Sequence, residues 1–154
     1  IQRERPEMVL VGGSRFHHAV GPDGRMLAGT RNEEALEEGL ARTLADLGGL
    51  ADEVVLFRDL PKAPHDMTDC VSDNVDSLDK CAFPRDDGGA RIDEGAARAT
   101  PGVRLIDLAP AFCRENLCHP VIRDVLVYRD NDHMTATFAR TLAPWLQRAL
   151  NTHA

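Results

Sequence analysis

A carboxylate and an imidazole stand three positions apart near the C-terminal end of the chain, at Asp130 and His133. They follow an apolar stretch, Val125–Tyr128, and precede a helix-forming segment. In such a turn Asp130 can accept a hydrogen bond from His133 Nδ1, which fixes the tautomer and leaves Nε2 as a general base toward a serine hydroxyl. From the spacing alone, a loop histidine beside capping carboxylates is a simpler interpretation than a catalytic Asp-His pair.

Other polar clusters predict no metal and no cofactor. His17-His18 lacks a third ligand nearby in the sequence. Asp130, Asn131 and Asp132 resemble half of a calcium loop, but the glycine and the glutamate that complete such a loop are absent.

Four cysteines form two local pairs, Cys70 with Cys81 and Cys113 with Cys118. Neither spacing matches the two C-x2-C pairs of a zinc ribbon. We therefore expect two disulfides, each contributing ~2–3 kcal/mol, and an oxidising, extracytoplasmic compartment. The alternative is four free buried thiols in a cytosolic protein.

The composition and charge indicate which kind of ligand the protein binds. The 154 residues carry a formal net charge of −7 and are 43% hydrophobic, which is typical of a soluble globular domain. A nucleic-acid surface would need clustered Lys and Arg, so a neutral or weakly polar ligand such as a sugar is favoured. No apolar run approaches the ~18 residues of a membrane span. No signal peptide follows Ile1, so we expect an internal piece of a longer protein or a processed product.

The apolar pattern alternates strands and helices. We expect strands at Met8–Val11, Glu53–Phe57, Val103–Leu108 and Val125–Tyr128, and helices at Asn32–Leu47, Ala90–Ala99 and after Thr135. Thr30 and Glu33 have capping-box spacing ahead of the first helix, and Gly48-Gly49 should end it. Residues 61–89 hold few apolar side chains and predict a long surface excursion.

Nearly continuous apolar strands that alternate with helices indicate an α/β fold, with a mainly parallel sheet flanked by helices. Ligands of such sheets bind beyond the carboxyl ends of the strands. A final strand at Val125–Tyr128 would place Asp130 and His133 at such an end.

The stretch from Tyr128 to Thr135 (YRDNDHMT), leading into a helix with Phe138 and Leu142, resembles the closing block of SGNH/GDSL hydrolases. More closely, it is similar to the SGNH domain that lies C-terminal to the membrane-embedded acyltransferases of acyltransferase family 3. RPEMVLV, EVVLFRDLP, Cys70 and VRLID before the Cys113/Cys118 pair resemble that group in the same order. The resemblance spans residues 6–150.

The resemblance implies a three-layer, flavodoxin-like SGNH fold that acts on acyl esters of carbohydrate, by O-acyl and above all O-acetyl transfer or removal. It implies Asp130 and His133 as members of a Ser-Asp-His triad, with an acyl-enzyme and an oxyanion hole. The substrate would be a cell-surface glycan. The partner would be an upstream membrane acyltransferase domain in the same polypeptide, with this domain on the outer side of the membrane.

The Gly-Asp-Ser block that carries the family's nucleophile does not occur in this sequence. In the favoured interpretation, residues 1–154 are one partial SGNH-like domain without its first strand block. MVLV would then match the family's third conserved strand and Arg15-Phe16 its end. In the alternative, Gly12-Gly13-Ser14 is a degenerate first block with Ser14 as nucleophile, although Ser14 is equally compatible with a plain turn serine. Two rival functions stay open: a free-standing secreted carbohydrate esterase, and a non-catalytic glycan-binding or docking module.

Overall fold

The structure is a computed structural model that describes residues 4–14, 17–85 and 92–152. The chain divides into two compact units. Unit 1 comprises Ile1–Asp59 and Gly88–Asp107, and unit 2 comprises Leu60–Asp87 and Leu108–Ala154.

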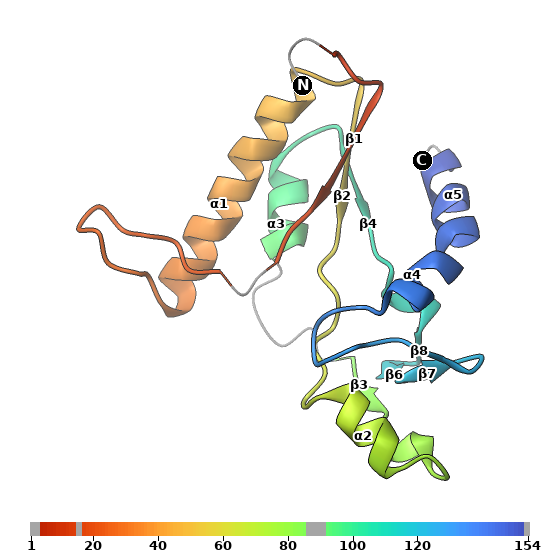
Figure 1. Ribbon diagram of the computed structural model, residues 1–154. Coiled ribbons are helices and arrows are strands. Elements are labelled where there is room, and N and C mark those ends of the chain that lie inside the picture. Colours follow the sequence, from red (N-terminus) through yellow and green to blue (C-terminus); the bar gives the residue numbers. More distant parts are fainter. Residues whose placement is uncertain (1–3, 15–16, 86–91, 153–154) are drawn as a thin grey trace. The chain divides into compact units, whose positions relative to one another are not determined.

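Unit 1 is built on a parallel three-stranded sheet of order β1-β2-β4 (Figure 1). The strands are β1 (Met8–Gly12), β2 (Glu53–Phe57) and β4 (Val103–Ile106). The central strand β2 is the most deeply buried, with Val54, Val55 and Leu56 at most 3% exposed, because it has a neighbour on each side. Three mainly apolar runs thus form a parallel sheet, which confirms the predicted α/β fold class.

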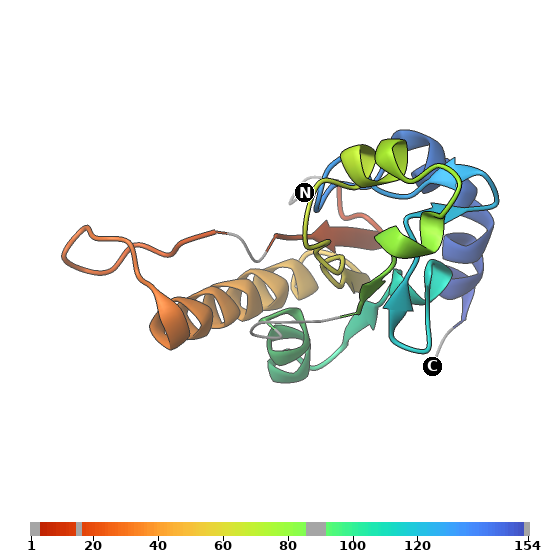
Figure 2. The ribbon, with the colours of Figure 1, turned by 90° about the horizontal axis from the view of Figure 1, so that it is seen from below.

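Two helices, α1 (Gly29–Gly48) and α3 (Ile92–Ala99), pack on this sheet and on each other (Figure 1). Leu44 of α1 and Ala96 of α3 are fully buried in the core of unit 1. In Figure 2, residues 17–28 loop out beyond the N-terminal end of α1. The helix α1 ends at Gly48 with Gly49 as its C-cap, as expected, and the first two residues of the predicted Ala90–Ala99 helix lie outside the described residues.

The capping box expected at Thr30 and Glu33 is wrong. Ala28 precedes the helix and makes no side-chain cap. Gly29 has a positive φ of 57°, so the chain turns into the helix at this glycine. Thr30 therefore lies inside the first turn instead of ahead of it.

The carboxyl ends of β2 and β4 are joined by ion pairs. Arg58 follows β2, and its guanidinium lies 3.1 Å from Asp107, which follows β4, and 3.1 Å from Glu94 of α3. The Arg58 side chain is 14% exposed. Two acidic partners therefore compensate for the desolvation of this cation.

Unit 2 combines short strands and helices around an aromatic core. Its elements are α2 (Met67–Asp73), η1 (Leu78–Cys81), β3 (Phe83–Pro84), η2 (Ala109–Ala111), β5 (Cys113–Arg114), β6 (Leu117–Cys118), β7 (Val121–Ile122), β8 (Val125–Leu126), α4 (Ala136–Thr141) and α5 (Ala143–Asn151). Tyr128 makes edge-to-face contacts with Phe83 and Phe112, and Phe112 makes another with Phe138, with ring centroids 5.8–6.0 Å apart. All four rings are at most 2% exposed.

Residues 61–85 are not the surface excursion that the sequence predicted, and residues 86–89 lie outside the described ranges. Ala63, Met67, Cys81 and Phe83 are all at most 2% exposed within the core of unit 2. The apolar residues of this segment are few, but these four are spaced so that they reach the core, whereas Val75 is 66% exposed. The polar residues between them occupy the surface.

Both predicted disulfides are present. Cys70–Cys81 joins α2 to η1, and Cys113–Cys118 joins the paired strands β5 and β6.

The predicted parallel strand at Val125–Tyr128 is also wrong. Only Val125–Leu126 is a strand (β8), and it pairs antiparallel with β7. Between them Arg123 and Asp124 both have positive φ, 48° and 63°, which is the backbone of a two-residue hairpin turn. The segment therefore pairs locally, and Asp130 follows a hairpin in unit 2.

The C-terminal helix begins after Thr135 as predicted, since the Thr135 hydroxyl accepts a hydrogen bond from Phe138 N–H. It is two helices, α4 and α5, because Pro144 has no N–H to continue the helical ladder. Among the described residues, no helix combines the length and the apolar character needed to cross a membrane.

Candidate active site

Asp130 and His133 lie on one tight loop of unit 2. Tyr128 and Met134 pair as an antiparallel bridge at its base, and Arg129 N–H donates to the carbonyl of His133 at 2.9 Å. The loop thus begins and ends at fixed points, which restricts the positions that the two side chains can take.

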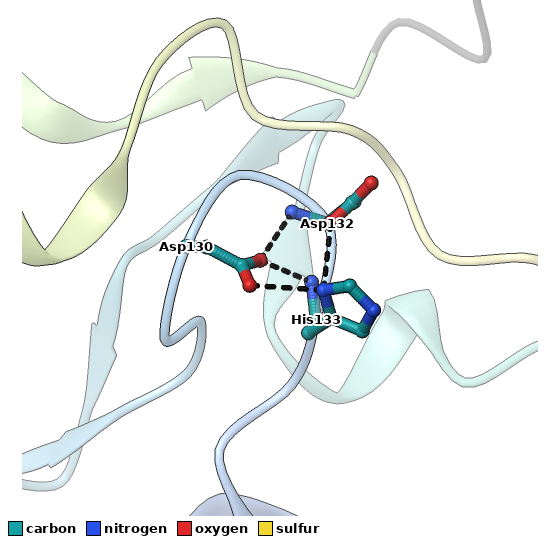
Figure 3. Close-up of side chains that lie close together, drawn as sticks. All are labelled: Asp130, Asp132 and His133. Carbon is teal, nitrogen blue, oxygen red and sulfur yellow. Dashed lines mark hydrogen bonds and ion pairs between the residues drawn. The ribbon is translucent and has the colours of Figure 1, made fainter. Parts of the chain in front are cut away.

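The Asp130 carboxylate holds both the backbone of this loop and the imidazole (Figure 3). Its Oδ1 accepts from the N–H groups of Asp132 at 3.0 Å and His133 at 2.7 Å, which is an Asx turn. Its Oδ2 lies 2.9 Å from His133 Nδ1. The hydrogen bond expected from the D-x-x-H spacing is therefore present, with Nδ1–H as the donor if the carboxylate is ionised.

The electrostatics of the loop favour an ionised Asp130. The backbone hydrogen bond from Asp132 lowers the pKa of this carboxyl well below its usual range, and the backbone, ring and charge of His133 act in the same direction against a smaller opposing effect of burial. The His133 side chain is 62% exposed. Figure 3 shows its far edge, which carries Nε2, pointing away from Asp130.

Asp132 is a third member of the site that the sequence analysis did not assign. Its Oδ1 also lies 2.9 Å from His133 Nδ1. The sequence signal that could have identified it is its position, because Asp132 directly precedes His133. Ligand atoms of Asp130, Asp132 and His133 lie within 4.8 Å of one another and could in principle surround a cation, but exposed acidic groups commonly gather without one.

A segment far away in the sequence supports the loop through backbone hydrogen bonds. Ala63 N–H donates to Asn131 O at 2.8 Å, and Met67 N–H donates to Asp130 O at 3.2 Å. The Thr68 hydroxyl donates to Arg129 O at 2.7 Å.

Just before the loop, the buried Tyr128 hydroxyl donates to Pro61 O at 2.6 Å. Four consecutive residues, 128–131, are thus bonded to residues 61–68. No local motif marks these partners, because they are more than sixty positions apart.

Ser14 lies in the other unit from the Asp130–His133 pair. It is exposed and follows β1 in unit 1. The structure brings Asp130 and His133 together and does not place Ser14 with them in one unit. Its role as nucleophile stays a prediction, and Arg15-Phe16 lies outside the described residues.

Comparisons with known proteins find a matching family and a similar fold over most of the chain. A family model described as "SGNH domain (fused to AT3 domains)" matches residues 1–148. Among solved structures, the periplasmic domain of a lipopolysaccharide acetyltransferase from Salmonella ser. Paratyphi A is similar, with a TM-score of 0.69 and 16% sequence identity. The match covers 98% of this chain and 59% of that chain, and at this identity it shows the fold. No curated protein matches the chain.

Proposed function

The chain belongs to the family of SGNH domains that are fused to AT3 domains, and we propose that it takes part in the transfer or removal of O-acyl groups, above all O-acetyl groups, on a cell-surface glycan. The single observation that carries this proposal is the Asp130–His133 pair. One carboxylate oxygen lies 2.9 Å from Nδ1, and the ring is 62% exposed. Within the described ranges Nε2 has no hydrogen-bond partner, so a serine hydroxyl can approach it.

The proposed chemistry needs no cofactor. His133 Nε2 accepts the proton of a serine hydroxyl while the serine oxygen attacks the carbonyl carbon of the ester. The protonated His133 then gives that proton to the leaving alcohol, and an acyl-serine remains. A glycan hydroxyl or a water molecule, deprotonated by His133, attacks the acyl-serine and restores the enzyme. Asp130 orients the ring throughout and faces the positive charge while it exists.

The nucleophile of this mechanism lies in a segment upstream of Ile1, with Ser14 as the alternative. Three observations support the upstream position. No Gly-Asp-Ser occurs in the 154 residues, and the chain spans only 59% of the similar acetyltransferase domain. In unit 1 β1 is an edge strand that pairs only with β2 among the described residues, and an edge of this kind can accept a further strand.

The proposed location is the extracytoplasmic face of the membrane, with an upstream membrane acyltransferase domain in the same polypeptide. The two disulfides support it, because such bonds persist in oxidising compartments. The similar solved structure is described as a periplasmic domain.

The test is esterase activity of the polypeptide extended upstream until it includes a Gly-Asp-Ser block. We expect it to cleave p-nitrophenyl acetate, and His133→Gln to reduce turnover by about 10²- to 10⁴-fold. His119→Gln is the matched control, because His119 is another unit 2 histidine with no part in the loop. Serine-to-alanine variants of the Gly-Asp-Ser block and of Ser14, made separately, identify the nucleophile. Turnover that survives His133→Gln would refute the triad, and a folded but inactive extended chain would favour a glycan-binding module.

A further inference from the structure

His133 Nδ1 has two carboxylate neighbours at the same distance. Oδ2 of Asp130 and Oδ1 of Asp132 each lie 2.9 Å from this nitrogen. Only the Asp130 contact has the geometry of a hydrogen bond, and Asp132 Oδ1 lies at ion-pair distance from the same nitrogen. The two side chains are also similarly exposed, at 34% and 29%, and burial does not distinguish them as acceptors.

The two carboxylates differ in their other hydrogen-bond partners. Asp130 accepts from two backbone N–H groups as well as from the ring. For Asp132, the imidazole is its one side-chain partner among the described residues. The Asx turn explains why Asp132 reaches the ring, because Asp130 binds the N–H of Asp132 itself and thereby fixes its backbone beside His133 (Figure 3).

From this arrangement we infer that Asp132 is a second positioning residue for His133. Asp130 holds the Nδ1 proton, and Asp132 Oδ1 is close enough to accept it when Asp130 is neutralised, so the ring keeps its tautomer and orientation. This inference deepens the proposed function and rests on it for its catalytic meaning. During acyl transfer, two carboxylates instead of one would flank the imidazolium after Nε2 has taken the serine proton.

The test follows the tautomer of His133 by NMR of the isotopically labelled imidazole, at a pH well above the ordinary histidine range. His133→Gln assigns the signal. Asp130→Asn is the informative background, because its amide carbonyl still accepts the backbone N–H groups while its NH₂ can turn toward Nδ1 and favour the wrong tautomer. If Asp132 acts as inferred, this variant keeps the Nδ1–H form as the main species.

Removing Asp132 in that background should then change the ring. We expect Asp130→Asn with Asp132→Ala to lower the ratio of Nδ1–H to Nε2–H forms by about tenfold relative to Asp130→Asn alone. Asp130→Asn with Asp132→Asn should fall between them, because the amide keeps an acceptor oxygen. Asp73→Ala in the same background removes an exposed acid of unit 2 and should change nothing. Equal ratios with and without Asp132 would overturn the inference.

A second measurement is independent of Asp130→Asn. In Asp132→Ala alone, the Nδ1–H proton should exchange with water at least about threefold faster, since it loses the second carboxylate beside Nδ1. An unchanged exchange rate would contradict the inference. Turnover by the extended polypeptide separates the two proposals: if the tautomer depends on Asp132 but esterase activity is insensitive to His133, the proposed function fails and the positioning role stands.

Discussion

The Tyr128 hydroxyl offers a direct measure of how strongly residues 61–68 hold the loop that carries His133. Tyr128 is fully buried, and its hydroxyl donates to Pro61 O at 2.6 Å. Tyr128→Phe removes this donor and keeps the ring, so the edge-to-face contacts with Phe83 and Phe112 should survive. The substitution therefore isolates the hydrogen bond from the packing.

The expected loss of unfolding free energy is about 1–2 kcal/mol. A typical hydrogen bond contributes about 1 kcal/mol net, and a buried acceptor left without its donor adds part of its desolvation penalty. The cavity term is small, because only one oxygen atom is removed. With a urea dependence of about 2 kcal/mol per molar, the unfolding midpoint of the variant should fall by roughly 0.5–1 M.

Urea unfolding followed by Trp145 fluorescence is the appropriate assay. Trp145 is the single tryptophan of the chain and lies in α5, within the same unit as Tyr128. Phe138→Leu serves as a control, because it disturbs the aromatic cluster without touching the hydrogen bond. A Tyr128→Phe variant within about 0.3 kcal/mol of the wild type would refute the view that this bond anchors the loop.

Two further predictions concern acid and the disulfides. The pKa of Asp130 is lowered in the folded state, so its stabilising effect is complete above the ordinary carboxyl pKa of about 4 and declines as the pH falls below it. Urea titrations should therefore show Asp130→Asn less stable than wild type at pH 7 and the gap shrinking by pH 3. Cys70→Ser with Cys81→Ser should cost about 2–3 kcal/mol of unfolding free energy. Mass spectrometry of native material should find no alkylatable thiol, and four thiols would contradict both bridges.

Unit 1 could be predicted from the sequence because its signals are local and continuous. The run MVLV is apolar throughout and EVVLF is apolar after its first residue, and each forms a strand of the parallel sheet. The periodic leucines of α1 lie over this sheet and pack in its core. The apolar composition and the helical period sufficed here, because a short apolar run followed by an amphipathic helix is typical of a parallel α/β unit.

Unit 2 was harder to predict because its structure depends on single residues and on distant contacts. Arg123 and Asp124 adopt positive φ and turn a predicted strand into a hairpin, although neither is the glycine that usually marks such a turn. Pro144 divides a helix that looks continuous by its apolar period. Ala63 and Met67 enter the core from a segment that is mostly polar.

The candidate site depends on a local sequence signal and on distant contacts, and only the local part was predictable. Asp130 and His133 are three positions apart, so one Asx turn suffices to bring the carboxylate to the ring. The support for that turn comes from residues 61–68, whose last members begin α2. Cys70 lies in the same helix, and its bond to Cys81 fixes α2 against η1. The Cys70–Cys81 disulfide therefore also stabilises the helix that supports the loop of the proposed general base.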